Sequence, residues 1–334
     1  MQLLIIIIAV SFFVLFIVFQ FTSEDKKLKT ARNNILKKEQ PENPGQAHKY
    51  EQVVELLEEK KFTGKERKIY ARACFLLFNY YNSKSGTRKD FLKGIKFGEK
   101  IKSNCEGFSF YENVVFSLGN IYFFNLFEFP KARNTYTRLI KIKPETKWGK
   151  ICKIRINLIE ENESNTKALR LYVTAEKLFE NSKFKEATEY LNKVIKQFGN
   201  IKLIAHAYYF VGDIYYYKMQ DLNRAEANYI EACKQSSIRE IARNSLYKIG
   251  EIKRKKKKWE KAIKIYKKFI GQFPNSPGVE DAYYYIGESY LKLGKLKAAK
   301  NSFNLILGDF PDSKWTDVIY HKVQNINKEL YNYA

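Results

Sequence analysis

Apolar residues recur at helical spacing along most of the chain, and this pattern predicts its elements. Hydrophobic side chains fall three or four positions apart in YEQVVELLEEKKF (50–62), ERKIYARACFLLFNYY (66–81) and DFLKGIKFGEKI (90–101). This spacing places the apolar side chains on one face of an α-helix. Similar segments follow as far as the end of the chain. We therefore expect an all-α protein built from amphipathic helices.

The amino terminus has a different pattern, a single apolar run. Residues 3–21 carry no charge, and these 19 residues would make roughly 28 Å of helix, close to the thickness of a bilayer core. Neither a basic front nor a small-x-small cleavage site accompanies the run, which disfavours a removable signal peptide. We expect residues 1–22 to form one transmembrane anchor. Residues 23–45, with a basic segment at 26–38, are expected to form a tether.

A repeat of 37 or 38 residues organises the second half of the chain. Small residues recur at that spacing in the first helix of each unit: Ala175, Gly212, Gly250 and Gly287. About thirteen residues further on lies an alanine of the second helix, and four residues later a large side chain: Ala187 and Leu191, Ala225 and Tyr229, Ala262 and Tyr266, Ala299 and Phe303. A small residue on each helix lets two antiparallel backbones approach closely, and the large side chains fill the surrounding space.

The last unit has the pattern of the tetratricopeptide repeat (TPR), carried by Tyr283, Ile286, Gly287, Tyr290, Ala299, Phe303 and Pro311. The chain therefore resembles the TPR superfamily, with units at about 168–201, 205–238, 243–276 and 280–313. An earlier unit surrounds Gly119, and its turn carries one extra residue, as does the turn of the unit around Gly212. The resemblance implies a TPR-like α-solenoid of antiparallel helix pairs.

Two similar segments indicate how the repeats are grouped. PETKW (144–148) and PDSKW (311–315) each follow a complete unit and open an amphipathic helix. The apolar positions of these helices are Ile151, Cys152, Ile156 and Ile159 in the first, and Val318, Ile319, Val323 and Ile326 in the second. A solenoid needs a terminal helix over its last apolar face. We expect a degenerate block at 46–161 with its own cap helix, and a block at 166–334 that ends in a cap helix at 314–332. The alternative is one continuous superhelix.

Composition adds a charge of +24, spread along the whole chain. Such an excess suits an anionic partner, although an AT-rich genome would also produce a lysine-rich chain. The four cysteines have neither disulfide nor zinc spacing, and the three histidines lie far apart without a nucleophile. We expect no enzyme activity, no cofactor and no metal site.

The resemblance implies a protein-binding groove lined by the first helices. Its expected residues are four tyrosines and four acids at matching positions: Tyr172, Tyr209, Tyr247 and Tyr284, with Glu176, Asp213, Glu251 and Glu288. Tyrosine offers rigid contact area, and the acids would pair with Lys or Arg of a ligand. The alternative is that the tyrosines fill gaps between repeats while the acids pair with neighbouring lysines.

The densest charge run offers a second surface: Lys253, Arg254, Lys255, Lys256, Lys257 and Lys258. Cations near a helix carboxyl terminus are favourable in themselves, so a solvated turn is one interpretation. The other is an anionic membrane or polyanion surface that includes the 26–38 segment. Nucleic acid is disfavoured, because no aromatic residues are interleaved with the run.

The expected partners are therefore one or more proteins in the groove and a membrane at the amino-terminal helix. QFPNSP (272–277) and DFPDSKW (309–315) are similar to segments of TPR proteins of the bacterial envelope, such as the Tol–Pal coordinator and the outer-membrane-assembly lipoprotein. The architecture also resembles flagellar-motor scaffolds of the spirochaete collar type. This resemblance favours a single-pass inner-membrane protein with a periplasmic soluble part and a place in a larger complex. The lysines after the span favour the cytoplasm.

Overall fold

The computed structural model describes residues 29–59, 64–83, 88–199 and 201–332. Within these ranges the regular structure is helical, which confirms the all-α prediction. None of the described helices is both long and apolar enough to cross a bilayer. The predicted anchor, residues 1–22, lies outside the described residues.

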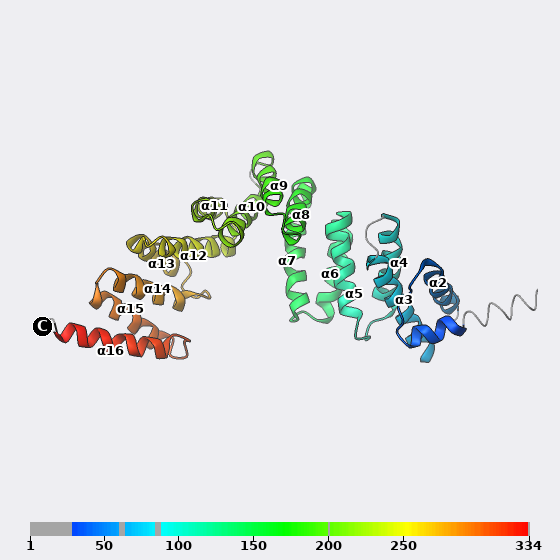
Figure 1. Cartoon of the computed structure of the whole chain (residues 1–334). Helices are drawn as coiled ribbons and strands as arrows, with labels where there is room; N and C mark the ends of the chain where they lie inside the picture. Colours follow the sequence, from blue (N-terminus) through cyan, green and yellow to red (C-terminus); the bar gives the residue numbers. More distant parts are fainter. Residues whose placement is uncertain (1–28, 60–63, 84–87, 200, 333–334) are drawn as a thin grey trace, which may run out of the picture. The chain divides into compact units, whose positions relative to one another are not determined.

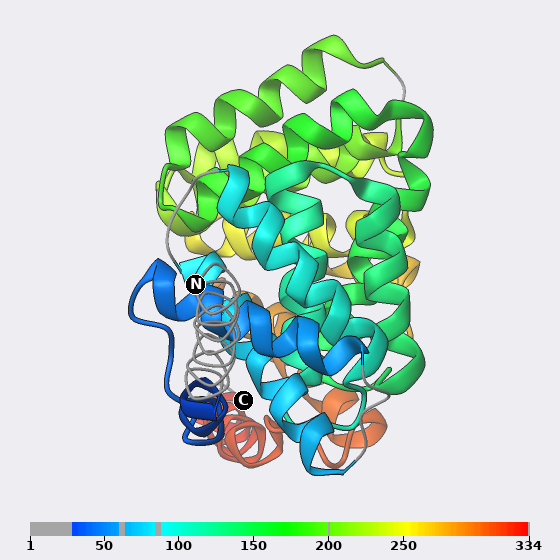
Figure 2. The ribbon, with the colours of Figure 1, turned by 90° about the vertical axis from the view of Figure 1, so that its right-hand side faces the viewer.

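The chain divides into two compact units, residues 1–159 and 160–334, each considered by itself. The first contains α2 (Pro44–Glu59), α3 (Lys65–Ser83), α4 (Arg88–Asn104), α5 (Tyr111–Asn120), η1 (Ile121–Leu126), α6 (Phe129–Ile142) and most of α7 (Lys147–Glu161). Figures 1 and 2 show its helices side by side in chain order.

The second unit consists of helix pairs followed by one terminal helix. The pairs are α8 (Thr166–Glu180) with α9 (Phe184–Gln197), α10 (Lys202–Asp213) and η3 (Ile214–Lys218) with α11 (Leu222–Gln235), α12 (Arg239–Lys255) with α13 (Trp259–Gln272), and α14 (Val279–Lys292) with α15 (Leu296–Asp309). The terminal helix is α16 (Thr316–Asn332). A short 3₁₀ turn, η2 (Glu163–Asn165), precedes α8. This arrangement confirms the TPR-like solenoid of helix pairs.

The repeated glycines mark the points where paired helices approach most closely. A Cβ on Gly287 would lie 2.4 Å from the Phe303 ring, and a Cβ on Gly212 would lie 2.7 Å from the Tyr229 ring. Gly119 faces Tyr136 in the same way, at 2.4 Å, in the first unit. Real Cβ atoms do not approach other atoms so closely, so these positions require glycine while the rings stay in place.

Five helix pairs, α5/α6, α8/α9, α10/α11, α12/α13 and α14/α15, have a residue in the left-handed conformation at the turn between their helices: Phe127, Ser182, Gln220, Lys257 and Gly294, with φ between 55° and 68°. The N–H of the next residue closes the helix end in the manner of a Schellman motif. Lys258 N donates to Lys253 O at 2.9 Å, and Lys295 N donates to Tyr290 O at 2.9 Å. Five helix ends thus have the same left-handed residue after the helix, although only one of these residues, Gly294, is a glycine.

The sequence analysis predicted that the extra residue of two units lies in their turns. This prediction is wrong, because the extra residue lies in the first helix of each unit. From the small residue of the first helix to the left-handed residue there are seven positions at Gly250–Lys257, but eight at Gly212–Gln220 and at Gly119–Phe127. The additional residue forms a π-helical turn, η1 or η3, at the end of the first helix. A π turn takes one more residue per hydrogen bond, so it absorbs the insertion while the turn keeps its geometry.

Both predicted cap helices exist as α7 and α16. Ile319 and Ile326 are buried in α16, and Cys152 and Ile159 in α7. Val318 is 41% exposed, so its predicted place in the cap interface is wrong. It adjoins the buried Ile319, whose side chain leaves the helix about 100° away.

A tryptophan at the start of each cap helix packs on a first helix of its unit: Trp148 is the second residue of α7, and Trp315 directly precedes α16. Trp315 stacks on Tyr284 with centroids 3.8 Å apart and donates Nε1–H to Asp281 at 2.6 Å. Trp148 packs on Phe116 with centroids 4.3 Å apart. The two similar PxxKW segments therefore share a packing role.

The described part of the predicted tether, residues 29–45, is packed rather than open. Residues 29–36 are helical, and Ala31 and Ile35 are buried. Arg72 donates to Leu36 O at 2.8 Å, and Tyr50 donates to Glu39 O at 3.0 Å. The apolar residues four apart form a helical stripe, which the prolines and charges of the segment obscured in the sequence.

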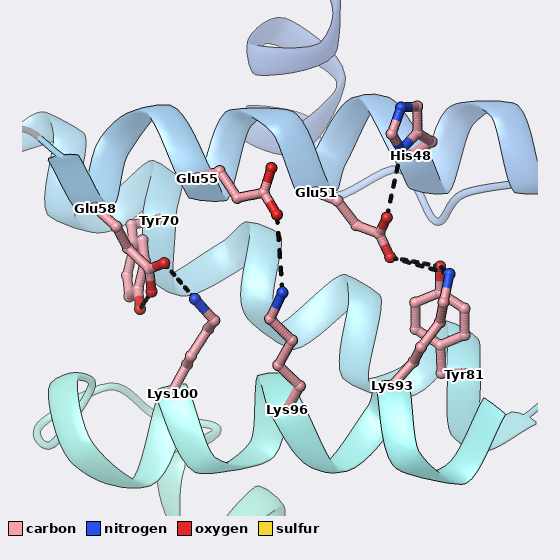
Figure 3. A network of polar contacts seen from close by, with 9 residues as sticks. All are labelled: His48, Glu51, Glu55, Glu58, Tyr70, Tyr81, Lys93, Lys96 and Lys100. Carbon is pink, nitrogen blue, oxygen red and sulfur yellow. Dashed lines mark hydrogen bonds and ion pairs between the residues drawn. The ribbon is translucent and has the colours of Figure 1, made fainter. Parts of the chain in front are cut away.

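A ladder of polar contacts holds α2 against α3 and α4 (Figure 3). The α2 acids Glu51, Glu55 and Glu58 face Lys93, Lys96 and Lys100 of α4, with Lys93–Glu51 at 3.6 Å and Lys96–Glu55 at 3.7 Å. From α3, Tyr81 donates to Glu51 at 2.7 Å and Tyr70 to Glu58 at 2.8 Å. The spacing of three or four residues on each helix brings these side chains into one row.

Candidate functional site

The four predicted groove tyrosines lie in the packing between helices. Tyr209 contacts the Tyr229 ring at 5.6 Å, and Tyr247 contacts Phe269 at 5.3 Å. Tyr284 is only 9% exposed beneath Trp315. Tyr172 packs on Phe210 of the next first helix, with centroids 5.9 Å apart. These rings fill gaps between helices, which is the alternative that the sequence analysis left open.

Burial also governs the ionisation of these tyrosines. Desolvation, followed by the nearby Asp213 carboxylate, raises the pKa of Tyr209 to about 12. Desolvation likewise raises the pKa of Tyr247 and of Tyr284. These shifts follow from the half-burial of Tyr209 and Tyr247 and from the burial of Tyr284.

The predicted acids interact with other groups of the chain. Asp213 accepts from the Tyr229 hydroxyl at 2.7 Å, and burial raises the pKa of this carboxyl. Glu251 pairs with Lys248 at 2.7 Å, and Glu288 pairs with Lys322 of α16 at 2.9 Å. Glu176 is half-buried on α8. The acids are thus engaged in stabilising their own repeats.

The basic run is only partly available to a ligand. Lys253 and Lys256 both pair with Glu226 of α11, the second at 2.7 Å. Burial would raise the pKa of Glu226, but hydrogen bonds from these two lysines outweigh it and lower that pKa. Arg254 lies over the Tyr285 ring at 4.3 Å. The exposed members of the run are Lys255, Lys257 and Lys258.

A groove of about 640 Å³ lies between η3 and α12, both parts of first helices. Its lining includes Tyr216, Tyr217, Lys248, Glu251 and Lys255. Tyr216 is buried and forms the floor, whereas Tyr217 is 54% exposed. The two rings meet edge to face, with centroids 4.7 Å apart. We refer to these five residues as the η3 groove.

Cations surround the aromatic floor of the η3 groove. The Nζ atoms of Lys255 and Lys248 lie 4.1 Å and 5.1 Å from the centre of the Tyr216 ring. Burial would lower the pKa of Lys248, but Glu251 and Tyr217 raise it further, so this lysine stays charged. A cation over an aromatic face is held by the ring quadrupole. The groove therefore presents an exposed tyrosine beside the positive charge of Lys255 and the Lys248–Glu251 ion pair.

Of the predicted groove residues, the structure places only Glu251 in the η3 groove. Sequence reasoning missed Tyr216, Tyr217 and Lys248, and it assigned Lys255 to the basic run alone. The available signal was the extra residue before Gln220, within the aromatic run IYYYK (214–218). Tyr217 lies within the π turn η3 and is exposed.

These features define an α-solenoid of helix pairs with a ligand-sized groove between first helices. Residues 244–276 and 281–313, which form the pairs α12/α13 and α14/α15, match the family model described as Tetratricopeptide repeat. The chain therefore carries tetratricopeptide repeats. No curated protein gives a significant match.

Solved structures of similar fold include several TPR proteins, all distant in sequence. One is YrrB, described as a TPR protein with an unusual peptide-binding site. The match has 16% sequence identity, covers 65% of this chain and 94% of that chain, and has a TM-score of 0.37. A second is the C-terminal part of a TPR repeat-containing protein from Cytophaga hutchinsonii. The match has 16% sequence identity, covers 87% of this chain and 98% of that chain, and has a TM-score of 0.42. A third is MamA. The match has 19% sequence identity, covers 60% of this chain and 96% of that chain, and has a TM-score of 0.34.

Proposed function

We propose that this chain is a non-catalytic scaffold that binds a protein partner in the η3 groove and is anchored to a membrane by residues 1–22. Tetratricopeptide repeats are a protein-interaction fold, and their stacked helix pairs leave an extended surface for binding. The observation that carries the proposal is the exposed Tyr217 beside Lys248 and Lys255. Among the described residues, His, Cys, Asp and Glu form no cluster of three that could hold a metal.

The groove suits a partner segment with an acidic side chain beside an apolar or aromatic one. Tyr217 offers rigid amphipathic contact area, and tyrosine is enriched among residues that dominate binding energy. Lys255 is exposed and pre-positioned over Tyr216, so a carboxylate can reach it with little ordering cost. The predicted acids Asp213, Glu251 and Glu288 are already paired within the chain, which favours this chemistry over a basic ligand.

Photo-crosslinking from position 217 tests the groove. A benzoylphenylalanine in place of Tyr217 should capture a partner in cells, and the product should fade by at least about tenfold when Lys255→Glu is added. Tyr320 on α16 is the matched control, because it is 55% exposed against 54% for Tyr217. Equal capture from positions 217 and 320, or capture unaffected by Lys255→Glu, would contradict the proposal.

The membrane placement proposed here is a single pass through the inner membrane with the repeats in the periplasm, within an envelope complex such as the flagellar motor. It is supported by the apolar run 3–21 and by the resemblance to envelope TPR proteins. An enzyme active only outside the cytoplasm, fused to the carboxyl terminus, should be active. A stable but inactive fusion would place the repeats in the cytoplasm.

A further inference from the structure

The first unit contains a cavity that the proposed function does not use. It has a volume of about 580 Å³ and lies between residues 38–40, α3 and the segment that leads into α5. This volume is in the range of cavities that hold small ligands. We call it the α3 pocket.

Aromatic rings from two elements form an apolar surface in the α3 pocket. Phe75 of α3 stacks on Phe110, with centroids 4.6 Å apart and planes inclined by 21°. Phe108 stacks on Phe110 in turn, at 5.5 Å and 23°. All three rings are half-buried, so their remaining faces are open to the cavity that they line. An apolar group can lie against this surface.

Three cations line the same cavity: Lys38, Lys68 and Arg72. None of the described residues that line the cavity is an aspartate or glutamate. Lys38 occupies the left-handed position that ends the helical residues 29–36, and Glu39 N donates back to Asn34 O at 3.1 Å. Arg72 is oriented by its hydrogen bond to Leu36 O at 2.8 Å. The backbone thus places two of the cations, and Arg72 retains further donors for an anion.

We propose that the α3 pocket binds the phosphate head group of an anionic phospholipid, with the first part of its acyl chains against the phenylalanine rings. A phosphodiester needs several cations and few acids around it, whereas the glycerol and acyl carbons need an apolar wall. The pocket supplies both.

The position of the pocket along the chain favours a lipid over an acidic peptide; this step rests on the anchoring proposed above. Lys38 follows the end of the predicted span by sixteen residues, eight of which are helical. Even a fully extended connection could place it no more than about 45 Å from the span. Basic residues at such a site gain from the negative surface of anionic membranes.

Native mass spectrometry of the full-length chain in non-ionic detergent tests the site with two lipids, palmitoyl-oleoyl-phosphatidylglycerol and its phosphatidylcholine counterpart. Phosphatidylglycerol should bind in preference to phosphatidylcholine. Lys68→Glu should reduce the phosphatidylglycerol-bound fraction at least fivefold, and the charge-neutral Phe110→Ala should reduce it at least twofold. Lys297→Glu, an exposed lysine of α15 with the same change in charge, is the control and should leave the fraction unchanged.

Several outcomes would overturn the proposal. These are equal loss in Lys68→Glu and Lys297→Glu, no preference between the two lipids, or unchanged binding in Phe110→Ala with a native circular-dichroism spectrum. Displacement of the lipid by millimolar glycerol 3-phosphate would point to a site for free phosphate esters, and displacement by an acidic peptide to a protein partner. Carbonate extraction of cell membranes tests the anchor separately, so failure of the anchor and failure of the pocket are distinguishable.

Discussion

At the residue scale, the side chain of one repeat position decides how closely two helices pack. Gly119, Gly212, Gly250 and Gly287 each lie under the ring of a second-helix residue. Glycine inside a helix lowers stability by about 1 kcal/mol relative to alanine, so the close contact with the ring must stabilise the fold by more than about 1 kcal/mol.

Gly287→Ala should destabilise the second unit by about 1–3 kcal/mol, because its Cβ would lie 2.4 Å from Phe303. Gly308→Ala is the matched control, since nothing lies within 4 Å of its Cβ. It should leave stability unchanged or raise it by up to about 1 kcal/mol. Urea unfolding followed by the fluorescence of Trp315, which packs beside Gly287's neighbour Tyr284, measures both. Equal stability of the two variants would refute the close-approach account.

Spacing was enough to predict Gly287 and its partner Phe303, because close helix approach needs a small residue at a fixed step. It was not enough for Tyr284. A repeat position predicts which side of a helix a residue occupies, but not what covers that side. Here Trp315 covers it, and that contact depends on how the chain turns into α16. Tyr217 was missed because its position carries no repeat signal: the matching residue of the other π turn, Phe124, is buried, whereas Tyr217 is exposed.

At the element scale, the turn within each helix pair is a fixed design with variable residues. Lys257 and Gly294 hold the same left-handed position, at φ 55° and 68°. A residue with a Cβ pays roughly 1 kcal/mol for this conformation, whereas glycine adopts it freely. The turn is therefore open to improvement at four of its five occurrences.

Lys257→Gly should stabilise the second unit by up to about 1 kcal/mol, and Gly294→Ala should destabilise it by a similar amount. Lys257 is exposed, and a Cβ at Gly294 would contact nothing within 4 Å, so packing changes do not interfere with the comparison. Thermal unfolding followed by circular dichroism gives the two shifts. Shifts of the same sign would show that the left-handed conformation is not what limits these turns.

At the scale of the whole molecule, buried phenols couple the stability of the repeats to alkaline pH. Burial raises the pKa of Tyr229, Tyr247 and Tyr266, and it raises that of Tyr209 to about 12. In the unfolded chain these groups ionise near pH 10. The folded state therefore retains protons that the unfolded state loses.

Because the folded pKa values lie above the unfolded ones, this contribution to stability is complete below about pH 10 and is lost as pH rises above it. Up to about pH 9 we expect tyrosine ionisation to leave the free energy of unfolding unchanged. Between about pH 10 and 12 the free energy of unfolding should fall. Absorbance at 295 nm follows the ionisation of the tyrosines, and circular dichroism recorded in parallel follows the helices. The buried set should ionise only with loss of the helical signal; smooth ionisation of all tyrosines in a folded chain would contradict this.

The two π turns suggest how such an array can change over evolutionary time. An insertion in an α-helix normally rotates every later side chain by about 100° and would misalign the helix that follows. In η1 and η3 the additional residue is taken up before the left-handed residue, so Ala132 and Ala225 still follow that residue by five positions, as Ala262 and Ala299 do in the shorter repeats. A single codon can therefore be gained at the end of a first helix without loss of the fold. The π turn η3 contains an exposed tyrosine, Tyr217, which lines the η3 groove. Selection for a binding partner can act on such a residue.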